Sequence, residues 1–109
     1  GNGSLSDGIY KGLASEANLV LVKVSENGSI PEKNIEKGLQ WILKNCEKYN
    51  IRIVNLSLGG DLDVATNESK INQLAEELVR LGVVVTVAAG NTAESNSIPP
   101  ASASSVITV

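Results

Sequence analysis

The sequence predicts an α/β fold with a parallel sheet. Two observations carry this prediction. Short apolar segments alternate with segments of helical periodicity, and the apolar segments are almost continuously hydrophobic. Strands of a parallel sheet are covered on both faces, so they show continuous apolar runs rather than alternation. The length of 109 residues corresponds to one domain at most.

The expected strands and loops follow one another along the chain. Residues 1–8 are rich in turn-forming residues and predict a loop. Residues 17–24, 51–58 and 83–89 predict buried strands, because Val, Leu and Ile dominate all three segments. A short last strand is expected to open at Val106.

Two segments have the periodicity of an amphipathic helix. In residues 31–50 the apolar side chains share one helical face, and Pro31 suits the first turn. In residues 68–81 a second stripe is followed by Gly82, a good C-terminal stop. Right-handed crossovers put both helices on the same face of the sheet unless the winding reverses, and the other face then needs cover from elsewhere in the domain. The stripes consist of Ile35, Leu39, Ile42, Leu43 and Cys46, and of Ile71, Leu74, Ala75, Leu78 and Leu81.

Composition argues against several functions. The net charge is −3 and no run of Lys or Arg occurs, which argues against nucleic acid or an anionic membrane surface as the partner. No apolar run reaches transmembrane length. A single cysteine, Cys46, excludes an internal disulfide and a multi-cysteine zinc site. The chain has no histidine, so a Ser-His-Asp or Cys-His site cannot be assembled from this chain alone.

Two loops follow neighbouring strands at the carboxyl edge of the expected sheet, where parallel α/β proteins bind ligands. One is Ser57-Leu58-Gly59-Gly60 and the other is Gly90-Asn91-Thr92. Glycine lets another backbone approach closely, and Asn91 offers a neutral amide donor, so the loops could hold an extended peptide and polarise a carbonyl. The pattern alone favours the simpler interpretation, in which both loops are strand-ending turns.

Four motifs in order resemble the middle of the catalytic domain of subtilisin-like serine proteases (subtilases, peptidase family S8). The resemblance runs without a break from residue 1 to residue 109. It implies that residues 1–109 form a single partial domain, an incomplete portion of a three-layer, subtilisin-like αβα fold with a parallel sheet. It also implies a parent that hydrolyses peptide bonds. It also favours secretion slightly. It places this segment between the catalytic His and the catalytic Ser, so the triad lies outside the chain and the isolated chain is expected to be inactive. The motifs are residues 10–19, 55–60, 82–91 and 106–109.

The resemblance also implies roles for individual residues. Asn91 matches the asparagine whose side-chain amide stabilises the oxyanion. The segment that pairs with the substrate backbone as an added strand is matched by Ser57, Leu58 and Gly59. The opposite wall of the substrate pocket is matched by Ala89 and Gly90. Pro99-Pro100 matches a place where the family often has a cis-proline turn.

No cofactor and no metal site are expected within this segment. Many family members bind calcium in the loop after the His helix, but here that loop is short and offers only Asp7 as a carboxylate. The parent could bind calcium elsewhere. The expected partner is a polypeptide substrate, without nucleic acid or membrane.

The resemblance also predicts how the isolated chain behaves. In the family's fold, the strand with the catalytic Asp lies between the strands matching residues 19–24 and 51–57. Without that strand, apolar strand edges are exposed, so the isolated chain is expected to self-associate as a homodimer. Two alternative functions stay open at this point. One is a subtilase homologue that binds peptides without cutting them, and the other is a nucleotide-binding α/β module.

Overall fold

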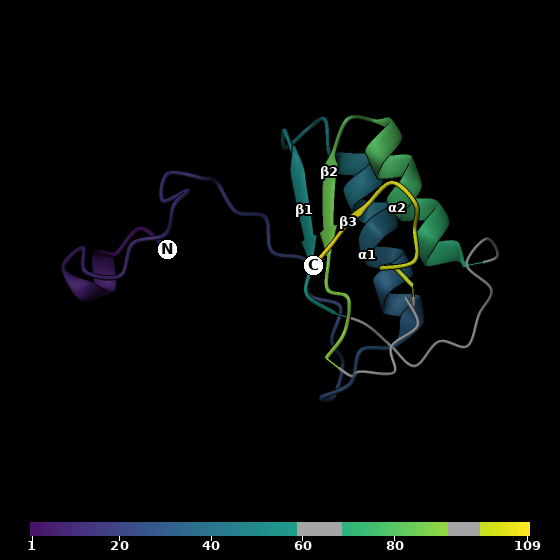
Figure 1. Ribbon diagram of the computed structural model, residues 1–109, viewed down its shortest axis with the longest axis horizontal. Coiled ribbons are helices and arrows are strands. Elements are labelled where there is room, and N and C mark those ends of the chain that lie inside the picture. The colour runs from purple at the N-terminus through teal and green to yellow at the C-terminus, as the bar shows by residue number, and fades with distance from the viewer. Residues whose placement is uncertain (59–68, 92–98) are drawn as a thin grey trace.

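The computed structural model describes residues 1–58, 69–91 and 99–109. Within these ranges one parallel sheet has the strand order β1 (Ile53–Leu56), β2 (Val84–Val87) and β3 (Ile107–Thr108). The helices α1 (Glu32–Asn45) and α2 (Lys70–Arg80) lie side by side over one face of the sheet (Figure 1). A short 3₁₀ helix, η1 (Ser4–Ser6), lies in the N-terminal segment. This arrangement confirms the predicted parallel α/β fold and is consistent with part of a subtilisin-like αβα domain.

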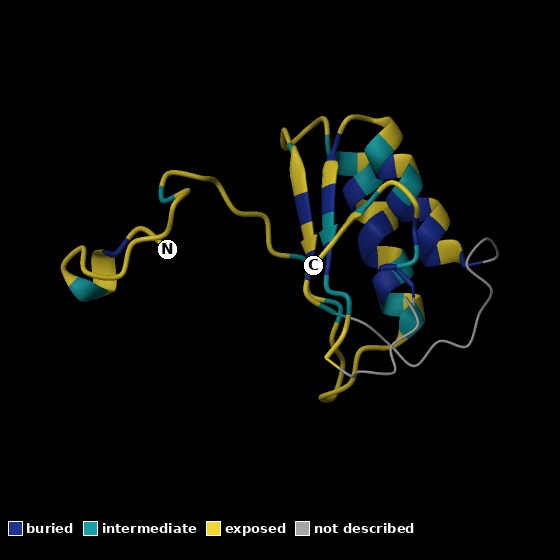
Figure 2. Cartoon of the chain, in the orientation of Figure 1, coloured by how far each residue is buried: buried dark blue, intermediate teal, exposed yellow. Residues whose placement is uncertain are grey.

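The core lies between the sheet and the two helices. Strands β1 and β2 pair in parallel from Ile53 opposite Val84 to Leu56 opposite Val87. Alternate residues of both strands are buried towards the helices, whereas Ile53 and Val84 are 67% and 45% exposed on the other face (Figure 2). In the described part of the chain the sheet therefore has one covered face and one open face. The core side chains include Leu39, Ile42, Val54, Leu56, Ile71, Leu74, Leu78, Val85 and Val87.

Helix α1 is shorter than predicted, and each helix begins at a defined N-cap residue. Pro31 is the N-cap of α1, which ends at Asn45 rather than near residue 50. The Ile51 amide donates to the Cys46 carbonyl (2.7 Å), so the residues between them form the turn into β1. At α2, the Ser69 hydroxyl caps the helix by accepting a hydrogen bond from the Asn72 amide (3.3 Å).

The prediction of a buried strand over residues 17–24 is wrong. No residue of this segment is assigned to a strand, and Leu19 and Leu21 are 79% and 89% exposed. Only Val22 and Val24 are half-buried, where they pack against the core beside Gly38 of α1. A strand needs a hydrogen-bonded neighbour, and the sheet formed by the described residues ends at β1. The segment is apolar, but an apolar segment does not form a strand without a neighbouring strand to which it can hydrogen-bond.

Candidate site at the carboxyl edge of the sheet

The two predicted loops leave neighbouring strands at the same edge of the sheet. The last paired residues are Leu56 of β1 and Val87 of β2, and both strands run in the same direction (Figure 1). The Ala88 amide donates to the Leu56 carbonyl (3.1 Å), which carries the pairing one step beyond the strands. Ser57 and Ala88 then line one open depression together with Val109. The structure thus brings Ser57, the start of the predicted substrate strand, close to Ala88, the residue before the predicted opposite wall.

Hydrogen bonds to β3 fix the backbone that leads to Asn91. The Val109 amide donates to the Val87 carbonyl (2.9 Å), and the Ala89 amide donates to the Val109 carbonyl (2.7 Å). Gly90 then has a φ of 108°, which residues with a side chain rarely adopt. The chain turns at this glycine and leaves Asn91 exposed at the rim of the edge.

Ser57 is held by a polar chain on the open face of the sheet. The Thr86 hydroxyl donates to the Asn55 side-chain carbonyl (2.9 Å), and the Asn55 amide donates to the Ser57 hydroxyl (2.9 Å). Asn55 and Thr86 are register partners in β1 and β2, so the sheet itself positions this pair. The sequence reasoning missed both residues. Their signal was a polar residue inside each of two otherwise apolar strands.

The other predicted site residues have different positions. Leu58 is half-buried and packs against the core, so its side chain supports the edge. Gly59 lies outside the described residues. The Pro99–Pro100 peptide bond is cis, as the resemblance implied, and both prolines are buried.

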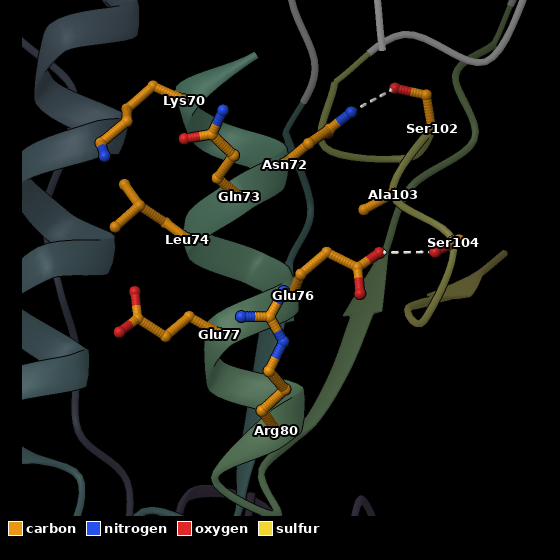
Figure 3. Close-up of a pocket in the computed structure, with 10 residues that line it drawn as sticks. All are labelled: Lys70, Asn72, Gln73, Leu74, Glu76, Glu77, Arg80, Ser102, Ala103 and Ser104. Atoms are coloured by element: carbon orange, nitrogen blue, oxygen red, sulfur yellow. Dashed lines mark hydrogen bonds between the residues drawn. The ribbon is translucent and has the colours of Figure 1, made fainter. Parts of the chain in front are cut away.

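A second polar cluster joins α2 to the segment before β3 (Figure 3). The Glu76 carboxylate accepts hydrogen bonds from the Ser104 hydroxyl (2.9 Å) and the Ser105 amide (3.0 Å). Hydrogen bonds from Ser105 and Ser104 lower the pKa of Glu76 to about 2. Its carboxyl group is therefore ionised at neutral pH. Because Glu76 lies on a helix far from this segment in sequence, periodicity alone could not have found the contact.

The described residues contain no group of three or more His, Cys, Asp or Glu side chains placed to hold a metal ion. Within the same residues, none of the helices has both the length and the apolar character needed to cross a membrane. Ser57 is the exposed hydroxyl at the site, but the chain supplies no imidazole that could activate it, because its sequence contains no histidine.

The parallel sheet, with two loops leaving its carboxyl edge, defines an α/β domain of the class that binds ligands at that edge. Comparison with known proteins gives the family. The sequence model of the subtilase family of peptidases (Peptidase S8) matches residues 1–109, and the chain belongs to this family. The resemblance drawn from the motifs is thereby confirmed.

Curated relatives agree with the family assignment. The chain is 37% identical over 112 residues to the subtilisin-like serine protease Pen c 1 of Penicillium citrinum, covering 97% of this chain and 27% of the relative. It is 38% identical over 103 residues to subtilisin-like protease 1 of Arthroderma gypseum, covering 90% of this chain and 20% of the relative. It is 39% identical over 100 residues to serine protease AprX of Bacillus subtilis, covering 83% of this chain and 22% of the relative. The chain thus spans about a quarter of these relatives' length or less.

Proposed function

We propose that this chain is the oxyanion-stabilising and substrate-binding part of a serine endopeptidase that hydrolyses peptide bonds. The observation that carries the proposal is the single edge at which the loops after β1 and β2 emerge, where Ser57 follows β1 and Ala89, Gly90 and Asn91 follow β2. Membership of the subtilase family and the similarity to serine proteases of other organisms support the same reaction.

The substrate of the proposed peptidase is an extended polypeptide. Its backbone would add as a strand beside residues 57–59, an interaction that uses main-chain hydrogen bonds and so accepts many sequences. Ala89 and Gly90 would form the opposite wall, where a backbone without large side chains leaves room for the substrate residue before the cut.

In the proposed reaction, a serine supplied from outside this chain attacks the carbonyl carbon of the substrate. The carbonyl oxygen becomes an oxyanion, and the Asn91 side-chain amide donates a hydrogen bond to it. Collapse of this intermediate expels the amine with a proton and leaves an acyl-enzyme, which water then hydrolyses. Asn91 suits this step because its amide is neutral, exposed and preceded by a backbone turn that Gly90 permits.

A fluorophosphonate probe, which labels activated serines covalently, tests this function. The intact parent should be labelled in a one-to-one ratio, and the isolated 109-residue chain should not be labelled, since it lacks histidine. A parent that binds peptides but stays unlabelled would identify a non-catalytic homologue. Labelling of a serine within this chain alone would show that the active site has been misplaced.

We also propose that the isolated chain self-associates. Ile53 and Val84 are exposed on the open face, and β1 is an edge strand of the sheet among the described residues. Unpaired apolar strand edges recruit other strands, so a homodimer is expected. Light scattering during size-exclusion chromatography measures this directly. A monomer with cooperative unfolding across micromolar to millimolar concentrations would contradict the proposal.

A further inference from the structure

Two side-chain contacts tie α2 to the segment that enters β3. The Asn72 amide donates to the Ser102 hydroxyl (2.9 Å), and the Glu76 carboxylate accepts from Ser104 and Ser105. In Figure 3 both side chains point from α2 towards this segment. The Glu76 contact is the one nearest to β3 in sequence, because Ser105 precedes the strand Ile107–Thr108 by two residues.

Strand β3 depends strongly on such tethers because it is short. Only two of its residues pair with β2, Ile107 opposite Thr86 and Thr108 opposite Val87. A ladder of this length contributes few hydrogen bonds, so contacts at its entrance decide how firmly its register is held. The Glu76 carboxylate is ionised, and hydrogen bonds to a charged acceptor are stronger than bonds between neutral groups.

The backbone of β3 in turn holds the loop that carries Asn91. Val109 follows the strand directly and makes hydrogen bonds with both Val87 and Ala89. Ala89 precedes Asn91 by two residues, with Gly90 between them. A continuous path of short contacts therefore connects Glu76 on the helix side of the sheet to the rim of the proposed active site.

We propose that Glu76 is a positioning residue: by holding Ser104 and Ser105 it fixes the register of β3, and through Val109 it fixes the backbone that aims Asn91. This inference rests on the proposed oxyanion role of Asn91. Glu76, which lies outside the site, thus helps to align the Asn91 side-chain amide with the oxyanion.

A double-mutant cycle in the intact parent peptidase tests this assignment. Glu76→Ala should lower kcat about 10-fold, within the 100-fold that a displacement of about 1 Å can cause, and KM should change by less than about threefold. In an Asn91→Ala background the same Glu76→Ala change should lower kcat by less than about twofold, because the aligned group is already absent.

Two further variants separate positioning from general damage. Glu76→Gln keeps an oxygen acceptor and should retain kcat within about threefold of the parent. Glu77→Ala removes the same charge one residue along α2, where the carboxylate points away from Ser104 in Figure 3, and should leave kcat unchanged. If Glu76→Ala does not accumulate as folded protein, Ser104→Ala removes one of the hydrogen bonds and should show a smaller loss of kcat that also disappears in the Asn91→Ala background.

The outcomes distinguish the inference from the proposed function. If Asn91→Ala lowers kcat strongly, but Glu76→Ala causes the same loss with and without Asn91, the positioning role is overturned and the proposed function stands. An equal loss of kcat in Glu77→Ala would also overturn it. If Asn91→Ala leaves kcat unchanged, both the proposed function and the inference fail.

Discussion

Replacing Leu78 by alanine should destabilise the protein far more than the same replacement at Leu81, three residues further along. Leu78 is fully buried in the core, whereas Leu81 is 60% exposed at the C-terminal end of α2. Each of the three carbon atoms removed from a buried leucine contributes about 0.8 kcal/mol, or about 2.4 kcal/mol together. The cavity left behind raises the cost at Leu78 to about 3–4 kcal/mol, within the range for buried leucines.

At Leu81 only the covered part of the side chain counts and no cavity forms, so the cost is about 1 kcal/mol or less. Equilibrium unfolding in urea measures both variants in the intact parent, with a serine-protease inhibitor present so that the proposed peptidase activity cannot degrade the protein. A difference of about 2 kcal/mol separates the two midpoints by about 1 M urea if the slope is about 2 kcal/mol per molar. Equal shifts of the urea midpoint in the two variants would refute the burial of Leu78 and the exposure of Leu81.

Two further predictions concern contacts outside the core. Hydrogen bonds from Ser105 and Ser104 lower the pKa of Glu76 from its ordinary 4.5 to about 2 in the folded protein, so its contribution to stability is complete well above pH 4.5 and is lost as the pH falls towards 2. Glu76→Gln should flatten the dependence of melting temperature on pH in that window, and an unchanged dependence would contradict the hydrogen bonds to Ser104 and Ser105. Gly38→Ala would place a Cβ atom 2.8 Å from a methyl group of Val24, so residues 17–24 should be cut faster in limited proteolysis. An unchanged cleavage rate would show that Val24 does not pack there.

Much of the fold was predictable because its signals are local. The stripe from Ile71 to Leu78 specifies α2, and the apolar run of β2 ends at a glycine. The prediction of a strand over residues 17–24 is wrong for the complementary reason. Its composition is that of a strand, but strand formation depends on a neighbouring backbone, which local composition does not reveal.

Part of the candidate site could likewise be predicted from the sequence, and part could not. The position of Asn91 beyond β2 followed from the rule that parallel strands present their carboxyl ends at one edge. The polar pair Asn55 and Thr86 depends on the register between two strands, and these residues are 31 apart in sequence. Glu76 and Ser104 are 28 apart. Contacts of this kind require the tertiary arrangement, although a polar residue inside an apolar strand could have directed attention to Asn55.

The most direct test of the proposed peptidase function is the kcat of Asn91→Ala in the intact parent protein. An oxyanion donor acts on charge that develops only in the transition state, so kcat should fall and KM should change little. The expected fall is about two to three orders of magnitude, the range known for this donor in subtilisin-type proteases rather than one derived from the present geometry. The melting temperature should match that of the parent, which excludes damage to the fold. A variant with near-parental kcat would contradict the account and leave Asn91 as a turn residue.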